Sequence, residues 1–229
     1  MSSNLRQQLP LRIGLKDSAT FANFLSAGNA MASHALQQLS EPFLYLWGGR
    51  GSGKTHLLQA ACHAMSEKGN GAAYLPMAEL SAMPPQLLEG MEQMSLVCVD
   101  DIDIIAGNTQ WEQALFHLYN RMRDSGRCLV AAGQSSPASL GLSLPDLVSR
   151  LSWGPVFQLQ ALDDEGKAEA LRLRASQRGM AMSSDVAGYL LNHAPRDMHA
   201  LFDLLDELDE VSLAAQRRLT IPFVRELIR

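Results

Sequence analysis

Residues 48–55 have the spacing G-x-x-x-x-G-K-[ST] of a phosphate-binding loop. Glycines allow backbone N–H groups to curl around phosphate oxygens, because no Cβ atom obstructs the approach. The ammonium of Lys54 would reach the β- and γ-phosphates, and the hydroxyl of Thr55 would bind Mg²⁺. The motif reads phosphates, so it leaves the base and the choice of di- or triphosphate open. We expect contacts to a nucleotide from Gly48, Gly51, Ser52, Gly53, Lys54 and Thr55.

Two acidic residues, Asp100 and Asp101, directly follow the apolar run at 96–99. They would lie at the carboxyl end of a buried strand, where ligands bind in open α/β sheets. Asp100 is the candidate metal partner, binding Mg²⁺ through water, and Asp101 is the candidate for orienting an attacking water. The alternative is that either residue caps the next helix. Since Asp is shorter than the Glu often found at the second position, we do not expect fast hydrolysis.

Alternating strands and helices would position these groups. Short apolar runs predict strands at 43–47, 72–75, 96–99, 128–132 and 156–159. A helical pattern precedes the first strand at 29–39, and others lie between strands at 54–65 and 109–124. The phosphate-binding motif thus follows a strand and opens a helix, as it must. Such alternation indicates βαβ units and a mostly parallel sheet.

Beyond about residue 162 the chain changes character. Only helical patterns occur there, at 163–178, 184–193, 196–214 and 221–228. We therefore predict an α/β fold with a parallel-sheet nucleotide-binding subdomain, followed by a small all-helical subdomain. The expected divisions are an extended N-terminal segment at 1–17, the α/β part at 18–162 and the helical part at 163–229.

The composition excludes several classes of protein. A hydrophobic fraction of 47% excludes a wholly disordered chain, and a net charge of -5 argues against a protein that binds nucleic acid through a basic surface. Three widely spaced cysteines form neither a disulfide framework nor a metal knuckle. No apolar stretch approaches the roughly 18 to 20 residues of a membrane span, and no secretory signal is visible. We expect a cytoplasmic protein that does not bind membranes.

Four further segments resemble the AAA+ ATPases and, more narrowly, the DnaA group. TFANF at 20–24, followed by Gly28-Asn29, resembles the lead-in to the nucleotide domain of that group, and Asp100-Asp101-Ile102 resembles its Walker B motif. LPDLVSRL at 144–151 resembles the box that carries an arginine finger, and PRDM at 195–198 resembles the sensor 2 turn. The resemblance covers roughly residues 18–229 and implies a P-loop AAA+ domain with a helical lid.

The resemblance also implies roles for single residues. Arg150 would be a catalytic finger donated to the nucleotide of a neighbour, and Arg196 would contact the phosphates of the chain's own adenine nucleotide, ADP or ATP. The alternative for both is a surface arginine. Gln134 lies near the sensor 1 position. Phe21 and Phe24 either flank the base or belong to the core. We expect structural roles for His56 and His63, and for Trp111 either a place in the core or a role as an interface anchor.

The N-terminus carries a short motif of a different kind. Gln8-Leu9-Pro10-Leu11 fits the Q-L-x-L pattern of peptides that bind the bacterial sliding clamp, the β subunit of DNA polymerase III. Gln8 would be the polar contact and Leu9 and Leu11 the apolar ones, with Pro10 keeping the backbone extended. Arg12 and Ile13 continue the pattern imperfectly, and a disordered tail is the alternative.

Taken together, the AAA+ motifs and the clamp-binding motif resemble those of the DnaA homologues that act together with the DNA-loaded clamp. In that reading the chain promotes hydrolysis of DnaA-bound ATP, which inactivates DnaA and restrains replication initiation. The chain ends at Arg229, where DnaA continues into a DNA-binding domain, and residues 203–210 contain five acids and no base. We therefore expect no sequence-specific DNA binding. The intrinsic ATPase should be weak or absent, because a single chain has no neighbour to supply Arg150.

Two other functions share the same motifs. A helicase loader of the DnaC kind would share the phosphate loop and lid, and it should add a helicase-binding extension and a basic surface. A plain AAA+ motor would hydrolyse ATP to drive its own movement. The Asp at position 101, in place of the usual Glu, argues against this function. Oligomeric state stays open in all three, because AAA+ surfaces self-associate, and a homo-oligomer is one alternative.

Overall fold

The computed structural model describes residues 19–195, 197–215 and 217–228, and its centre is one five-stranded parallel sheet. The strand order is β2-β3-β4-β1-β5, and each neighbouring pair is parallel. The predicted parallel sheet is therefore confirmed, and each predicted strand agrees with an observed one to within one residue. The strands are β1 (Phe43–Trp47), β2 (Ala72–Pro76), β3 (Leu96–Asp100), β4 (Cys128–Gly133) and β5 (Val156–Gln158).

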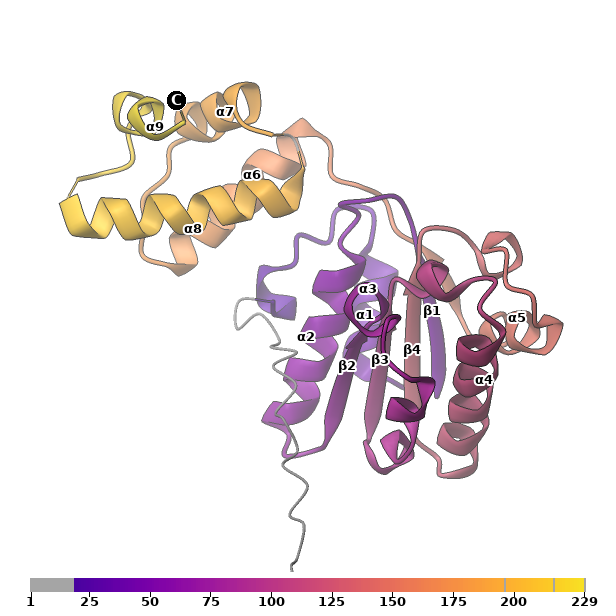
Figure 1. The fold of residues 1–229 in the computed structure, drawn as a ribbon. Helices are drawn as coiled ribbons and strands as arrows, with labels where there is room; N and C mark the ends of the chain where they lie inside the picture. Colours follow the sequence, from indigo (N-terminus) through magenta and orange to yellow (C-terminus); the bar gives the residue numbers. More distant parts are fainter. Residues whose placement is uncertain (1–18, 196, 216, 229) are drawn as a thin grey trace, which may run out of the picture.

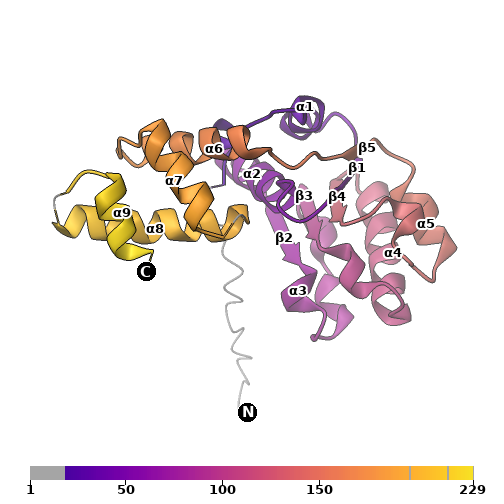
Figure 2. The same ribbon diagram turned by 90° about the horizontal axis from the view of Figure 1, so that it is seen from above.

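Helices cover both faces of this sheet (Figure 2). On one face α1 (Ala30–Gln38) and α2 (Lys54–Glu67) pack on strand residues that include Leu44 and Leu46. On the other face α4 (Thr109–Asp124) and α5 (Pro145–Leu151) pack on Phe43 and Tyr45. Successive residues of β1 thus serve opposite faces, as the pleat of a strand requires. This alternation explains why the run FLYLW is apolar throughout, since both faces of the strand are buried.

Shorter turns of helix connect these elements. They comprise α3 (Met77–Leu80) and the 3₁₀ turns η1 (Phe21–Asn23), η2 (Pro85–Leu88), η3 (Met91–Gln93), η4 (Ile102–Ile105) and η5 (Pro137–Ser139). Neither these turns nor α5 is predicted from the sequence, because they are too short to show a helical period. The long helix predicted at 109–124 coincides with α4.

Four helices after the sheet form a separate layer with a core of their own. They are α6 (Asp164–Gln177), α7 (Ser184–His193), α8 (Met198–Ala215) and α9 (Ile221–Leu227). Their apolar faces meet in one buried cluster that includes Leu171, Leu190, Leu201 and Phe223. In Figure 1 this helical layer, coloured orange to yellow, extends to the side of the sheet on which α2 lies. The predicted helical lid after the α/β part is confirmed.

A polar contact joins the two ends of the α/β part. The amide of Asn29 donates to the carbonyl of Gln160 at 2.9 Å and accepts from the N–H of Gln160 at 2.8 Å. Asn29 is buried, so this pairing satisfies a polar side chain that would otherwise be costly to bury. It fixes the start of α1 to the segment that leads into the lid. In the part of the chain that the structure describes, no helix is long and apolar enough to cross a membrane.

Candidate functional site

The phosphate-binding loop connects β1 to α2 at the carboxyl edge of the sheet, as the motif requires. Gly51 and Gly53 have φ angles of +75° and +93°, which residues with a Cβ atom rarely adopt. A Cβ atom on Gly53 would also come within 2.7 Å of the Phe24 ring. Glycine at position 53 is therefore needed both for the turn and for the close approach of Phe24.

Two side chains of the loop are buried in a manner suited to an anion. Lys54 is only 7% exposed, and its ammonium donates to the carbonyls of Gly48 at 2.8 Å and Gly49 at 3.1 Å. The hydroxyl of Ser52 is buried and has no hydrogen-bond partner within the described part of the chain. A phosphate group fits this arrangement, because it offers acceptors to the ammonium, the hydroxyl and the N–H groups of the loop.

The two residues expected to hold Mg²⁺ touch each other. The hydroxyl of Thr55 donates to the carboxylate of Asp100 at 2.6 Å, and Asp100 is 1% exposed. Tyr74, on the neighbouring strand β2, donates to the same carboxylate oxygen at 2.8 Å. Burial and the adjacent Asp100 charge raise the pKa of Tyr74, which keeps it a donor. Sequence reasoning missed Tyr74, whose only signal is its place near the end of the second strand.

Hard oxygen ligands of this kind suit Mg²⁺, which retains several waters and takes one or two carboxylates together with phosphates. Among the residues that the structure describes, no group of three or more His, Cys, Asp or Glu side chains could hold a metal alone. A Mg²⁺ ion here would therefore depend on the phosphates of a nucleotide. When bound, the ion would neutralise phosphate charge.

Asp101 lies beside Asp100 with a left-handed backbone, at a φ of +52°. Its position precedes η4, but its side chain makes no capping hydrogen bond there, contrary to the capping alternative. Burial, followed by the charges of Asp100 and Asp103, raises the pKa of Asp101, and Lys54 opposes this effect. The carboxyl group is thus close to the phosphate loop and not used as a cap.

Gln134 follows β4 at the same edge of the sheet. Its backbone N–H and its side-chain amide donate to the two carboxylate oxygens of Asp103 at 3.1 and 3.2 Å. Asp103 belongs to η4, two residues after Asp101. This pairing attaches the end of β4 to the loop that follows β3. No sequence pattern marks Asp103 as part of the site.

The segment before α1 packs between the loop and the lid. Phe24 lies against Gly53 and 5.4 Å from the ring of His56, and His56 Nε2 donates to the carbonyl of Thr20 at 2.9 Å. Phe21 and Phe24 both pack on the core cluster beneath α2. Burial lowers the pKa of His56, and the charge of Arg174 in the lid lowers it further, whereas the Thr20 carbonyl opposes the shift. The structural role expected for His56 agrees with these contacts.

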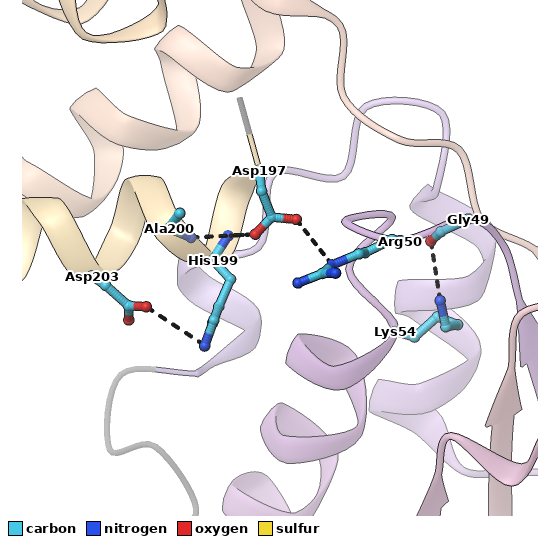
Figure 3. A network of polar contacts seen from close by, with 7 residues as sticks. All are labelled: Gly49, Arg50, Lys54, Asp197, His199, Ala200 and Asp203. Atoms are coloured by element: carbon cyan, nitrogen blue, oxygen red, sulfur yellow. Dashed lines mark hydrogen bonds and ion pairs between the residues drawn. The ribbon is translucent and has the colours of Figure 1, made fainter. Parts of the chain in front are cut away.

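One ion pair connects the loop directly to the lid (Figure 3). Arg50 Nε lies 3.4 Å from Asp197 Oδ2, and the other oxygen of Asp197 accepts from the N–H groups of His199 and Ala200. Asp197 therefore caps α8 with one carboxylate oxygen and forms an ion pair with Arg50 of the loop through the other. Arg196 lies outside the described residues, as do Gln8, Leu9 and Leu11.

Arg150 is placed away from this site, in the last turn of α5 and on the opposite face of the sheet from α2. Its guanidinium lies over the rings of Tyr119 at 5.9 Å and Trp153 at 5.4 Å. No carboxylate in the described part of the chain forms an ion pair with it. Trp153 is 65% exposed and Tyr119 is buried, so the guanidinium lies over one ring that faces solvent and one that belongs to the core. The structure brings the loop and acidic residues together and leaves Arg150 separate from them.

Comparisons with known proteins agree with this architecture. Residues 15–158 match the model of the bacterial DnaA ATPase domain, and residues 164–228 match the model of the lid domain of Hda. The chain belongs to the DnaA family of AAA+ ATPases. The resemblance to the DnaA group inferred from the motifs is thus confirmed, and the helical part is similar to the lid domain of Hda.

Several solved structures share this fold. Domain III of the replication initiation protein DnaA from Thermotoga maritima has a TM-score of 0.77 at 23% identity, over 92% of this chain and 95% of that one. AMPPCP-bound DnaA from Aquifex aeolicus has a TM-score of 0.68 at 23% identity, over 86% of this chain and 67% of that one. The RuvB Holliday junction branch migration motor of Thermotoga maritima reaches 0.61 at 17% identity, over 86% and 65%.

Proposed function

We propose that this chain is a nucleotide-binding regulator of chromosome replication initiation that promotes hydrolysis of ATP held by DnaA. It would act together with the DNA-loaded sliding clamp, so that DnaA is inactivated after replication begins. Membership of the DnaA family and the Hda-type lid support this proposal. The chain's own site would hold ADP or ATP with Mg²⁺, as the AMPPCP-bound relative suggests and as the residues around Lys54 and Asp100 permit.

The observation that carries the proposal is the location of Arg150. The guanidinium lies on the face of the sheet opposite α2, and it has aromatic neighbours rather than a carboxylate partner among the described residues. An arginine that serves its own nucleotide would have to lie near the chain's own phosphate loop. Arg150 instead suits donation to another molecule, where it would stabilise charge on the transferring phosphoryl group.

The same arrangement predicts little hydrolysis by the isolated chain. Arg150 does not contact the chain's own site, and Asp101 is shorter than the Glu that commonly orients water. We therefore assign the chain a role as an activator of hydrolysis in its partner, with weak or no activity alone.

The decisive experiment measures conversion of radiolabelled ATP-DnaA to ADP-DnaA in the presence of clamp-loaded DNA. Arg150→Ala and Arg150→Lys should both retain nucleotide binding and clamp binding and should lose roughly 10³-fold or more of the stimulated rate. Lysine cannot replace the planar guanidinium and its paired donors. Arg123 is an exposed arginine near the Tyr119 ring, so Arg123→Ala is the matched control and should convert DnaA normally. Wild-type conversion by Arg150→Ala would overturn the proposal.

A helicase-loader function is distinguished by a separate measurement. The proposed regulator should be recovered with immobilised clamp, whereas a helicase loader should be recovered with the replicative helicase. Recovery with the helicase alone would favour the loader. Robust ATP turnover by dilute, monomeric chain would favour an independent AAA+ motor.

A further inference from the structure

Glu112 is a fully buried carboxylate outside the nucleotide site. It lies in the first turn of α4 and is 0% exposed. Burying a charged side chain is costly unless its oxygens receive hydrogen bonds. The sequence analysis did not single it out, and the phosphate site does not use it. Its retention in the core therefore requires an explanation from its contacts.

Three backbone N–H groups supply these contacts. Glu112 Oε1 accepts from the N–H of Gly107 at 2.7 Å and from that of Ser143 at 3.0 Å, and Oε2 accepts from the N–H of Leu144 at 2.7 Å. Both oxygens are thus satisfied by donors alone, which an ionised carboxylate suits. The donors come from two loops that are more than 30 residues apart in the sequence.

Each of these loops leads to a group of the proposed mechanism. Gly107 follows η4, whose residues include Asp103, and so it ends the loop that begins at Asp101. Leu144 occupies the N-cap position of α5, whose last turn carries Arg150. Leu144 has no side chain able to cap a helix, so Glu112 provides negative charge at the N-terminal end of α5 instead.

A second contact between α4 and α5 lies near the other end of α5. Tyr119 is seven residues after Glu112, which is two helical turns, so both side chains lie on the same face of α4. Tyr119 lies under the guanidinium of Arg150 and stacks on Phe43 of β1, with ring centroids 3.9 Å apart. One face of α4 therefore contacts the N-cap of α5 through Glu112 and the last turn of α5 through Tyr119.

We propose that Glu112 is a positioning residue for Arg150: it fixes the start of α5 to α4 and to the loop after Asp101, so that the guanidinium is presented at a defined place. This role rests on the proposed function of Arg150 as a finger for DnaA-bound ATP. Because α5 has only seven residues joined by helical hydrogen bonds, a displacement at its start also moves its last turn.

The test uses Glu112→Gln, which preserves the shape of the side chain but replaces one acceptor oxygen with an NH₂ group. That group would face at least one backbone N–H, which loses a hydrogen bond and leaves a donor unpaired. We expect the maximal rate of DnaA-bound ATP hydrolysis, at saturating variant and clamp-loaded DNA, to fall at least tenfold. The variant's own nucleotide affinity should stay within twofold of wild type.

A double variant separates positioning from general destabilisation. In an Arg150→Ala background, Glu112→Gln should cause no further loss of stimulated rate, because the group that it positions is absent. Its effect on the denaturation midpoint should be the same in both backgrounds. Asn108→Ala is the matched structural control, since the Asn108 side chain caps α4 by accepting from the N–H of Trp111 at 3.3 Å and, among the described residues, makes no hydrogen bond to α5. It should lower the midpoint and leave stimulation unchanged.

The outcomes distinguish the two proposals. An inactive Arg150→Ala with a fully active Glu112→Gln overturns the role of Glu112 alone. A further tenfold loss in the Arg150→Ala background, or an equal loss in Asn108→Ala, overturns it as well. A fully active Arg150→Ala overturns the proposed function itself. If Glu112→Gln does not fold, Glu112→Asp is used instead, because it keeps the negative charge on a side chain one methylene shorter. A Glu112→Asp variant with a lowered denaturation midpoint but wild-type stimulation of DnaA would contradict the positioning role.

Discussion

Arg50 of the phosphate loop and Asp197 at the start of α8 form an ion pair with a distance of 3.4 Å between Nε and Oδ2. The contact spans the boundary between the sheet and the lid. Arg50 is 88% exposed, so water screens the pair strongly. Asp197 has a second function as the cap of α8, since its other oxygen accepts from His199 and Ala200.

Variants at Asp197 should separate these two functions. Asp197→Ala should destabilise the chain by about 1 kcal/mol, because it removes the helix cap as well as the ion pair. Asp197→Asn keeps an oxygen acceptor, so its loss of unfolding free energy should be less than half that of Asp197→Ala. Arg50→Ala keeps the helix cap, so its loss should also be less than half. Urea denaturation followed by circular dichroism measures the differences. An equal loss in Arg50→Ala and Asp197→Ala would show that the ion pair, and not the cap, dominates.

Removal of the Lys54 ammonium should weaken nucleotide binding. A charge-assisted hydrogen bond contributes about 1.5–3 kcal/mol, so Lys54→Ala should raise the Kd for ADP by on the order of 10- to 100-fold. The circular dichroism spectrum should be unchanged. Lys68→Ala, at the end of the same helix, is the control and should bind normally. Unchanged affinity in Lys54→Ala, measured by calorimetry, would contradict the assignment of the phosphate site.

The N-terminal motif predicts a contact with the sliding clamp. A fluorescent peptide of residues 1–15 should bind the clamp with a Kd of roughly micromolar, because a small contact area must also offset the ordering of the peptide. Gln8→Ala combined with Leu9→Ala should eliminate recovery with immobilised clamp and leave the melting temperature unchanged. Ser3→Ala combined with Asn4→Ala is the matched control outside the motif. If the Gln8→Ala, Leu9→Ala double variant is still recovered with the immobilised clamp, the clamp contact lies elsewhere in the chain.

The buried imidazole of His56 predicts a pH dependence of stability. Burial, aided by Arg174, lowers its pKa in the folded chain below the ordinary 6.5, so the unfolded chain takes up the proton first as the pH falls. Stability from this group is complete above about pH 7.5 and declines as the pH falls through 6.5 towards the lower folded pKa.

Replacement of His56 by Gln isolates this contribution, because the amide can still donate to the carbonyl of Thr20 but does not titrate. The free energy of unfolding should fall less between pH 7.5 and 5.5 in His56→Gln than in the wild type. His34→Gln, an exposed histidine on α1, is the control and should follow the wild-type curve. Parallel curves for His56→Gln and wild type would refute the contribution.

The sequence alone determined the phosphate loop, the strand that precedes it and the helix that follows it, because the chemistry of that motif is local. Glycines at 51 and 53 permit positive φ angles within a few residues, whatever the rest of the chain does. The apolar runs and the helical period of 109–124 likewise depend only on which faces must be buried. The apolar runs predicted the parallel sheet, and the exclusively helical patterns after residue 162 predicted the lid.

Only the tertiary structure decided which distant side chains meet. Tyr74 reaches Asp100 because β2 and β3 are neighbours in the sheet, and a period of two along a strand does not specify its neighbour. Glu112 reads as an ordinary acidic residue near a helix start until the loop at 143–144 is folded over it. Short helices such as α5 escaped prediction for a related reason: seven residues are too few to show a period, and α5 is held by contacts from α4 that its own sequence does not contain.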